Sequence, residues 1–335
     1  MAGSAKSGRN MFIRFGIQSA IDVAATVFHD IEPVDIGGFL KESNTIASGR
    51  RLSTRFEGTG YPGANQYPFN FSVEFNPDVA GRILAAGIGA DAVVEVTTGV
   101  YTHTFGFDEV LPYCTVQLYA AGVADDTAAD EAIQLLNCKL DTISFQGGLD
   151  DILVMNVAGI GASYSAIAKP SFTPSTSNPL FLNNALATGK ISIGATLGAV
   201  AQFDEMTDLT VDIANGLAPD HRINDDPDAI GMREGTSTLS GSFTGVYNHE
   251  TWVEIDEFYK GNTRAIKIEA TEVAEFVAGY NRFLEIDLND VKWEGADPSW
   301  DPDLITASLP WKANVDATTV VIIQTADATV YDSAT

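Results

Sequence analysis

The feature that most constrains the fold is an alternating segment followed directly by an asparagine-initiated helix, and it occurs twice. In the first occurrence, residues 69–75 alternate between apolar and polar side chains, and a helix is predicted over 76–87. In the second, residues 236–246 mix small and polar side chains with two apolar anchors, and a helix is predicted over 248–261. Asparagine is a favoured N-cap and glycine commonly follows the last helical turn, so both helices carry start and stop signals.

The apolar spacing in the two predicted helices indicates that each helix covers one side of a β-sheet. Ile83 and Leu84 mark the buried side of the first helix, and Ile255 and Phe258 mark that of the second. We expect Phe258 to be buried deeply enough that truncation to alanine costs about 3 kcal/mol or more in stability.

Two further matches indicate an internal duplication. Residues 34–36 anticipate residues 211–213 at an offset of 177, and residues 140–147 anticipate residues 288–295 at an offset of 148. The two helices are 172 residues apart. A preserved order with a changing offset is expected when one β-rich module is duplicated and its loops are then extended. Chance similarity among short strands is the alternative, because each match alone is weak.

The duplication predicts two domains joined by a proline- and serine-rich linker. The N-terminal module, with a polar arm, spans 1–168, the linker spans 169–185, and the C-terminal module spans 186–335. Further alternating segments predict strands at 11–17, 93–96, 101–107, 114–119, 264–270, 283–288, 291–293, 309–315 and 319–324. The predicted fold class is mainly β, with two tandem β-barrel or β-sandwich modules that each carry one flanking α-helix.

Acidic residues strongly outnumber basic ones. The chain has 45 Asp and Glu against 19 Lys and Arg, for a net charge of -26. This charge argues against a surface built to grip nucleic-acid phosphates. It suits a surface past which nucleic acid must slide without sticking, and it equally suits a protein from a high-salt host.

The sequence indicates a soluble protein that is made inside the cell. Its longest apolar runs, such as 320–323, are far shorter than the roughly 20 residues of a membrane helix. The first ten residues do not have the pattern of a secretory leader. We therefore expect Cys114 and Cys138 to be free thiols, with a single disulfide as the alternative.

The pattern of potential catalytic and metal-binding residues predicts no enzyme, no cofactor and no metal site. His29, His103, His221 and His249 stand in separate segments, which favours surface or turn positions over metal ligation. The acidic run 225–228 lacks the glycine and distal glutamate of a known calcium loop, so it is interpreted as a solvated turn. Phosphate-loop, nucleophile-elbow and CxxC motifs are absent from the sequence.

The densest basic cluster contains Arg50, Arg51 and Arg55. A phosphate or partner site is one interpretation. A solvated or interface surface is favoured, because neither interleaved aromatic residues nor a glycine-rich cradle surrounds these arginines.

Several of these patterns together resemble a known family, the major tail tube proteins of long-tailed, siphovirus-like phages and archaeal viruses. In the C-terminal half the resemblance is carried by LTVDIANG at 209–216, LSGSFTGVY at 239–247 and LEIDLNDVKWEG at 284–295. In the N-terminal half, residues 42–51, 69–75 and 77–89 resemble the opening module of the larger, two-module members. The likeness covers nearly the whole chain through patterns of strand, helix and glycine.

This resemblance implies a structural virion protein of the viral tail, made in the host cytoplasm, that self-assembles into stacked rings. Each module would contribute strands to a continuous inner barrel and a helix outside it, and three two-module chains would close one ring with pseudo-six-fold symmetry. Genome DNA would pass through the channel without specific binding. The partners implied are further copies of the chain, a tape measure protein, and tail terminator and tip proteins. We expect the channel wall to be acidic on balance, and its candidate residues are outward-alternating acids of the strands, such as Asp208 and Asp212 or Glu285 and Asp287.

Two other functions remain open at this stage. A two-module, all-β carbohydrate-binding or carbohydrate-active protein would present an aromatic-lined groove with paired acids. An adhesin or surface-layer subunit would need an export signal.

Overall fold

The computed structural model confirms a mainly β fold. It describes residues 11–39, 41–46, 61–120, 132–149, 151–173, 175, 177–182, 187–222, 227–301, 304–315 and 319–332. The two α-helices of this part of the chain are α1 (Pro77–Gly87) and α2 (His249–Lys260). The strands are β1 (Met11–Ile17), β2 (His29–Ile31), β3 (Asp35–Phe39), β4 (Glu42–Ile46), β5 (Tyr61–Glu74), β6 (Asp91–Thr97), β7 (Val100–Gly106), β8 (Cys114–Ala120), β9 (Ala132–Gly148), β10 (Val154–Gly161), β11 (Ser163–Ile167), β12 (Ala187–Gly194), β13 (Val200–Gln202), β14 (Met206–Ala214), β15 (Ala218–Asp220), β16 (Gly231–Arg233), β17 (Thr238–Val246), β18 (Arg264–Val277), β19 (Tyr280–Trp293), β20 (Asp297–Trp300), β21 (Ile305–Ala313) and β22 (Val320–Thr325).

The central feature is a run of eight antiparallel strands, which we call the long sheet. Its order is β3–β5–β10–β9–β14–β17–β21–β20. Strands from both halves of the sequence contribute, and β9 meets β14 directly at the middle. Apolar side chains alternate with polar ones along these strands, so one face of the sheet is buried and the other is open.

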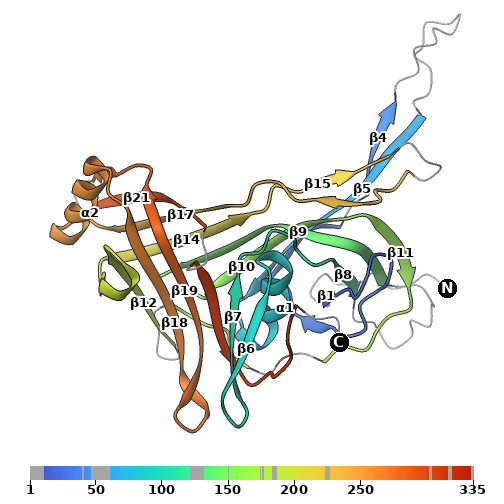
Figure 1. The fold of residues 1–335 in the computed structure, drawn as a ribbon, viewed down its shortest axis with the longest axis horizontal. Coiled ribbons are helices and arrows are strands. Elements are labelled where there is room, and N and C mark those ends of the chain that lie inside the picture. The colour runs from blue at the N-terminus through green and yellow to red at the C-terminus, as the bar shows by residue number, and fades with distance from the viewer. Residues whose placement is uncertain are drawn as a thin grey trace, which may run out of the picture.

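A second group of strands runs in the order β6–β7–β22–β19–β18–β12–β13. The β6–β7 and β18–β19 hairpins project in the same direction from the body of the molecule (Figure 1). Both turn at a glycine with positive φ, Gly99 and Gly279, a conformation that glycine adopts without strain. β19 belongs to both groups, because its first half pairs with β22 and its last residues pair with β21.

The remaining N-terminal strands form a third group in the order β2–β1–β8–β9–β11. The 17-residue strand β9 joins this group to the long sheet, because its first half pairs with β8 and β11 and its second half with β10 and β14. α1 packs between these layers, and its Gly87 lies against Ile143 of β9.

The two predicted helices are confirmed, together with their caps. The side chain of Asn76 accepts a hydrogen bond from the backbone of Asp78, and Asn248 accepts bonds from Glu250 and Thr251. Gly261 ends α2 in the left-handed conformation. Burial is confirmed for Ile83, Leu84 and Ile255. Phe258 is only partly buried at the edge of the core, so the sequence-based expectation of deep burial is wrong for that residue.

The segment predicted as a linker packs against the N-terminal half. Leu180 is fully buried, its N–H donates to the carbonyl of Phe75, and its own carbonyl accepts from Leu153. Phe172 packs against Phe12 with tilted rings whose centroids are 3.9 Å apart. The division into domains at 168 and 185 stays a prediction, and strand pairs such as β9–β14 and β7–β22 cross between the two halves.

Candidate functional site: a polar sheet face with two open edges

The open face of the long sheet carries polar side chains in register across seven strands. One row of directly opposed residues runs Asp35, Ser72, Asn156, Ser144, Asp212, Ser240 and Lys312. The next row on the other face is buried and apolar, and it runs Phe71, Val157, Ile143, Ile213, Leu239 and Ala313. The sheet therefore has one face that packs on the core and one that meets solvent along its whole width.

Neutral hydrogen-bonding groups make up most of this polar face. A neighbouring row contains Glu74, Val154, Gln146, Thr210 and Ser242. The hydroxyl of Ser72 donates to Oδ1 of Asn156 at 2.6 Å, so part of this face is cross-linked by side chains from adjacent strands. The face offers hydroxyl, amide and carboxylate groups to whatever passes it, with few cations.

The four acids expected along a channel wall are divided by the structure. Asp208 and Asp212 lie on β14 and point to the polar face of the long sheet. Glu285 and Asp287 lie on the first half of β19, which pairs with β18 and β22 in the second group of strands. The placement of all four acids along a channel wall stays a prediction, and Glu285 and Asp287 lie on the part of β19 that is outside the long sheet.

Asp287 lies in a crowded acidic environment. Its neighbour Glu285 is held by Lys267 at 2.9 Å, so the nearest ammonium group already has a closer partner. Burial, together with repulsion from Glu285, raises the pKa of Asp287 to about 6.

The long sheet ends at two edge strands. β3 pairs on one side with β5, and β20 pairs on one side with β21. Val34, directly before β3, is 61% exposed, and Trp300 at the end of β20 is 71% exposed. Tyr247 lies between Trp300 and Trp252 of α2, with ring centroids 6.0 and 6.5 Å away. Exposed aromatic side chains therefore extend from the β20 edge to α2, as at surfaces that bind another protein.

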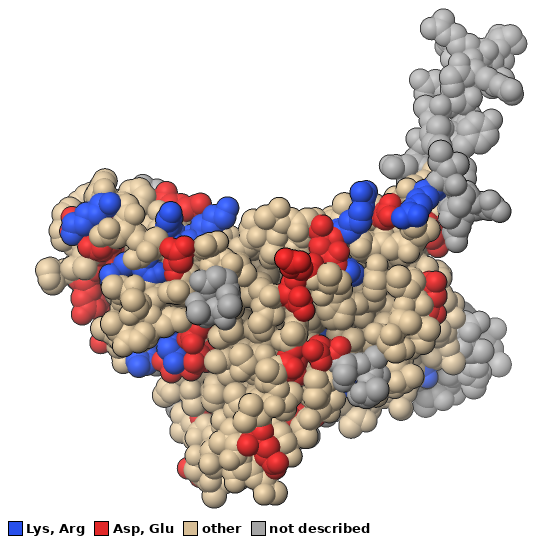
Figure 2. All heavy atoms as spheres, in the orientation of Figure 1, with Lys and Arg blue, Asp and Glu red and all other residues tan. Residues whose placement is uncertain are grey.

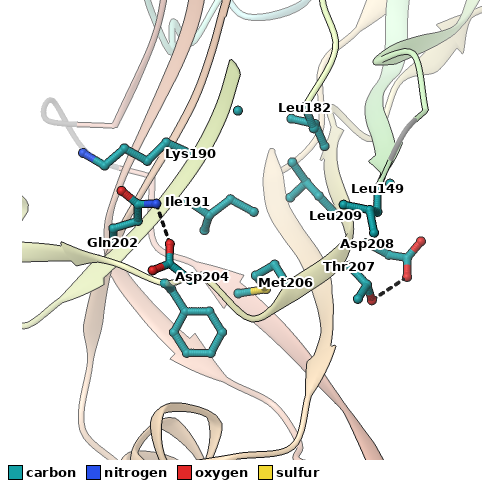
Figure 3. A pocket seen from close by; sticks show the side chains of 13 residues that line it. Leu149, Leu182, Lys190, Ile191, Gln202, Asp204, Met206, Thr207, Asp208 and Leu209 are labelled. Carbon is teal, nitrogen blue, oxygen red and sulfur yellow. Dashed lines mark hydrogen bonds between the residues drawn. The ribbon is translucent and has the colours of Figure 1, made fainter. Parts of the chain in front are cut away.

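A pocket of about 270 Å³ lies where β12 and β13 approach the start of β14. Figure 3 shows Asp204 and Asp208 on opposite sides of Met206, each held by its own neighbour. Gln202 donates to Asp204, and Thr207 donates to Asp208 at 2.9 Å. Phe203 is the one aromatic residue in this lining. The pocket therefore lacks the aromatic lining that the carbohydrate-binding alternative requires.

Two of the four histidines come together, which the sequence interpretation did not anticipate. His103 is fully buried, with Nδ1 2.9 Å from Oδ2 of Asp91 and Nε2 2.8 Å from the carbonyl oxygen of Asp327. Nε2 of His29 lies 3.5 Å from Oδ2 of Asp327. The interpretation of His103 as a surface or turn residue is therefore wrong, whereas His221 and His249 are exposed.

These histidines hold the C-terminal segment, residues 326–332, against α1 and β7. The ring of Tyr331 is fully buried, 4.4 Å from that of His103, and it occupies the space beside Gly81. Burial alone would raise the pKa of Asp327, but hydrogen bonds with His29 and Thr329 hold it well below its usual range. We call Asp91, His103, Asp327 and Tyr331 the C-terminal clasp.

The other candidates do not assemble a chemical site in the described residues. Arg50, Arg51 and Arg55 lie outside them, as do Asp225 and Asp226. Asp228 accepts hydrogen bonds from Asn65 at 2.7 Å and Tyr67 at 3.0 Å. Among the described residues, groups of three or more His, Cys, Asp or Glu side chains placed to hold a metal are not found.

Cys114 and Cys138 face each other on β8 and β9, and both are buried free thiols. Sγ of Cys114 donates to the carbonyl of Cys138 at 3.3 Å. Burial raises the pKa of the Cys114 thiol well above its usual value, which makes this thiol unreactive at neutral pH.

Sequence reasoning identified part of the polar face and missed its edges. The alternation of Asp208 and Asp212 with apolar residues predicted correctly that both acids lie on the open face of their strand. Trp300 and Tyr331 lie in polar segments without periodicity, so their roles depend on contacts that only the folded chain shows. A lone aromatic residue in such a segment was the only available hint.

Acidic and basic side chains are dispersed over the face in Figure 2, and several basic ones gather at the end that carries α2. In the described residues, each helix is too short or too polar to cross a membrane.

A family model described as phage tail tube protein matches residues 8–313. No curated protein matches the chain.

Proposed function

We propose that this chain, which belongs to the phage tail tube protein family, assembles into stacked rings that enclose the channel for the viral genome. Family membership makes it a structural component of the virion tail. The observation that carries the proposal is the long sheet, because it has a continuous polar face and because, within the described residues, each end strand is paired on one side alone. Closing such a sheet into a ring pairs edges that a monomer would leave exposed.

Three chains fit such a ring. Each chain brings eight strands to the wall, so three chains give a barrel of about 24 strands. With strands ~4.8 Å apart and tilted by ~40°, this barrel is about 45–50 Å across at the backbone. That width leaves room for a DNA duplex inside the side chains of the polar face. The two halves of each chain would then occupy equivalent places, which gives pseudo-six-fold symmetry.

The polar face is proposed as the channel wall. Hydroxyl and amide groups dominate it, and Asp35, Glu74, Asp208 and Asp212 outweigh Lys312 and Lys292, the residue opposite Lys312 on the last part of β19. A wall with few cations adds little salt-dependent affinity for phosphates, so DNA can pass without specific binding. The wall is therefore mildly acidic, and much of the net charge of -26 lies elsewhere, as Glu285 and Asp287 do.

Elements that project from the body suit contacts between stacked rings. The β6–β7 and β18–β19 hairpins extend to one side, while β4 and the start of β5 extend away from them (Figure 1). Synthesis in the host cytoplasm and contacts with a tape measure protein and with tail terminator and tip proteins complete the proposed role.

The test is the mass and appearance of the purified protein at high concentration. We expect rings or tubes by negative-stain microscopy, and a ring mass of three chains of 35.7 kDa each by native mass spectrometry. Rings of six chains would remove the eight-strand wall from the proposal. A monomer at every concentration would contradict assembly by this protein alone.

A further inference from the structure

The edges of the long sheet have the correct polarity to join copies of the chain. All neighbours in the order β3–β5–β10–β9–β14–β17–β21–β20 are antiparallel, and the number of strands is even. β20 therefore runs opposite to β3. A β3 strand from a second copy can continue the antiparallel alternation beside β20.

A template for this junction exists inside the chain. At the middle of the long sheet, β9 of the first half pairs with β14 of the second half, and we call this junction the seam. In this seam Gln146 lies opposite Thr210, and the backbone bond from Leu149 N–H to the Thr207 carbonyl fixes the alternation of the ladder. Hydrogen-bonded and non-hydrogen-bonded pairs alternate along an antiparallel ladder, and Leu149–Thr207 is a hydrogen-bonded pair. Gln146 and Thr210 lie three positions further along, so they form a non-hydrogen-bonded pair, whose side chains are close together.

The helix caps show which residues of the two halves are equivalent. Equivalent residues then show which positions on the open edges correspond to Gln146 and Thr210 of the seam. Asn76 and Asn248 are 172 residues apart, and Asn70 and Ser242 share that spacing. On β5, Asn70 lies opposite Gly38, and on β17, Ser242 lies opposite Thr210. Gly38 therefore occupies the position that Thr210 has in the seam.

The same alignment identifies the partner on the other edge. Gln146 lies opposite Val154, which lies opposite Glu74 of β5. At the corresponding place, Ser299 lies opposite Thr306, which lies opposite Val246 of β17. Glu74 and Val246 are again 172 residues apart. Ser299 therefore occupies the position that Gln146 has in the seam.

We infer that ring closure repeats the β9–β14 seam between chains, with β20 of one copy pairing antiparallel with β3 of the next so that Ser299 lies opposite Gly38. This inference rests on the proposed function. The occupant of the β20 edge is a second copy of this chain, because β3 carries the register that β14 has in the seam. Closure covers Trp300 and Val34, which are large apolar side chains exposed beside these edges.

Pro298 marks β20 as an edge strand, because proline in a sheet is confined to edges and bulges. It lacks an N–H, so the inferred junction has one hydrogen bond fewer than the β9–β14 seam. A second register follows if the sequence matches are used in place of the helix caps. They equate Asp35 with Asp212 and Ser144 with Lys292, and because Asp212 lies opposite Ser144 in the seam, this register would place Asp35 opposite Lys292. β18 already occupies that edge of β19, because Arg264 pairs with Val291.

Disulfide trapping tests the register. Gly38→Cys combined with Ser299→Cys places thiols at the inferred junction, and a Cβ at Gly38 meets no atom within 4 Å. The internal control is Gln146→Cys combined with Thr210→Cys, which reports the seam within one chain. A third variant, Asp35→Cys combined with Lys292→Cys, reports the competing register. Each is assembled under reducing conditions, oxidised, and analysed on non-reducing gels.

The Gly38/Ser299 variant should give covalent multimers up to the size of the ring, and each of its single variants should not. The Gln146/Thr210 variant should lose two thiols without a change in mass of the denatured chain. Rings with covalent multimers only in the Asp35/Lys292 variant, or in neither interchain variant, would overturn the register and leave the proposed function standing. Absence of rings from the unmodified protein would remove both.

Discussion

The two helices begin with the same cap and follow equivalent strands of one sheet, yet they lie in opposite environments. Most residues of α1 are buried, whereas the fully buried residues of α2 are Thr251, Glu254 and Ile255. α2 instead exposes Trp252 and Tyr259, and it lies at one end of the molecule, while α1 lies near its middle (Figure 1). Local sequence is enough to form each helix. The side chains that cover each helix, however, come from other parts of the chain.

The cover over α1 comes from parts of the chain that have no counterpart over α2. β1, β2 and β9 contact it from the N-terminal half, and β19 and β22 contact it from the C-terminal half. Arg282 of β19 donates to Asp78 at 2.8 Å, and Tyr331 packs on Gly81. In the ring that we propose, the C-terminal half of one chain would meet the N-terminal half of the next. The exposed face of α2 would then be covered by that neighbouring chain.

The largest difference between the helices should appear when a core side chain is truncated. Leu84→Ala leaves a cavity in fully enclosed packing and should cost about 3–4 kcal/mol in the free energy of unfolding. Phe258→Ala should cost only about 1–2 kcal/mol, because that ring is already partly exposed. Urea unfolding of the two monomeric variants measures both values. Equal losses would show that the two helices are equally buried in solution.

The C-terminal clasp should account for much of the remaining asymmetry. Tyr331→Ala removes a fully buried ring between Gly81 and His103 and should cost about 3 kcal/mol. Amide hydrogen exchange should then increase in α1 and remain unchanged in α2. A uniform increase in both helices would mean that the clasp stabilises the whole chain rather than this one helix.

The N-caps offer a smaller, closely matched comparison. Asn248→Ala should cost about 1 kcal/mol, because the side chain caps only its own helix. Asn76→Ala should cost about 2 kcal/mol, because Asn76 also donates to the carbonyl and hydroxyl oxygens of Ser177 at 3.0 and 2.7 Å. Asn→Asp at each site is the control, since aspartate keeps the cap acceptor and loses the donor. Only the variant at residue 76 should then remain destabilised.

The pH dependence of the clasp should be smaller again. The folded-state pKa of Asp327 is depressed, so its contribution is complete at neutral pH and is lost as pH falls below about 4 towards the folded pKa. Asp327→Asn should therefore cost on the order of 1 kcal/mol at pH 7 and progressively less as pH falls below 4. Unfolding curves for both proteins at several pH values measure this difference. A difference that grows on acidification would contradict the assigned hydrogen bonds of Asp327 with His29 and Thr329.

Local patterns predicted much of this fold because helix caps and alternating strands are written in consecutive residues. Asn76, Asn248 and Gly261 fixed helix ends, and the alternation around Leu209 and Val211 fixed which face of a strand is buried. These features depend only on neighbours within a few positions.

The pairings that build the candidate site are long-range, and the sequence does not encode them locally. Asp212 and Asp287 alternate with apolar residues in the same way, yet one lies on the polar face of the long sheet and the other on a separate group of strands. His103 becomes buried because Asp91 and Asp327, far apart in the chain, meet it in space. Phe258 is only partly buried because α2 lies at the edge of the core, which its helical spacing alone does not show.

The smallest effect on the stability of the monomer should come from Tyr259, the most exposed aromatic residue of α2. Tyr259 is 73% exposed on α2, so Tyr259→Ala should change the free energy of unfolding of the monomer by less than about 0.5 kcal/mol. In the assembled ring, however, an aromatic side chain at a subunit contact can contribute 2 kcal/mol or more. The variant should therefore shift ring formation to at least about tenfold higher protein concentration, since 1.4 kcal/mol corresponds to a factor of ten. Val330→Ala, an exposed apolar residue away from α2, is the matched control and should assemble normally. Mass photometry across a dilution series separates the two. Unchanged assembly by the Tyr259 variant would mean that α2 stays exposed in the tube, and that its difference from α1 has no role in joining subunits.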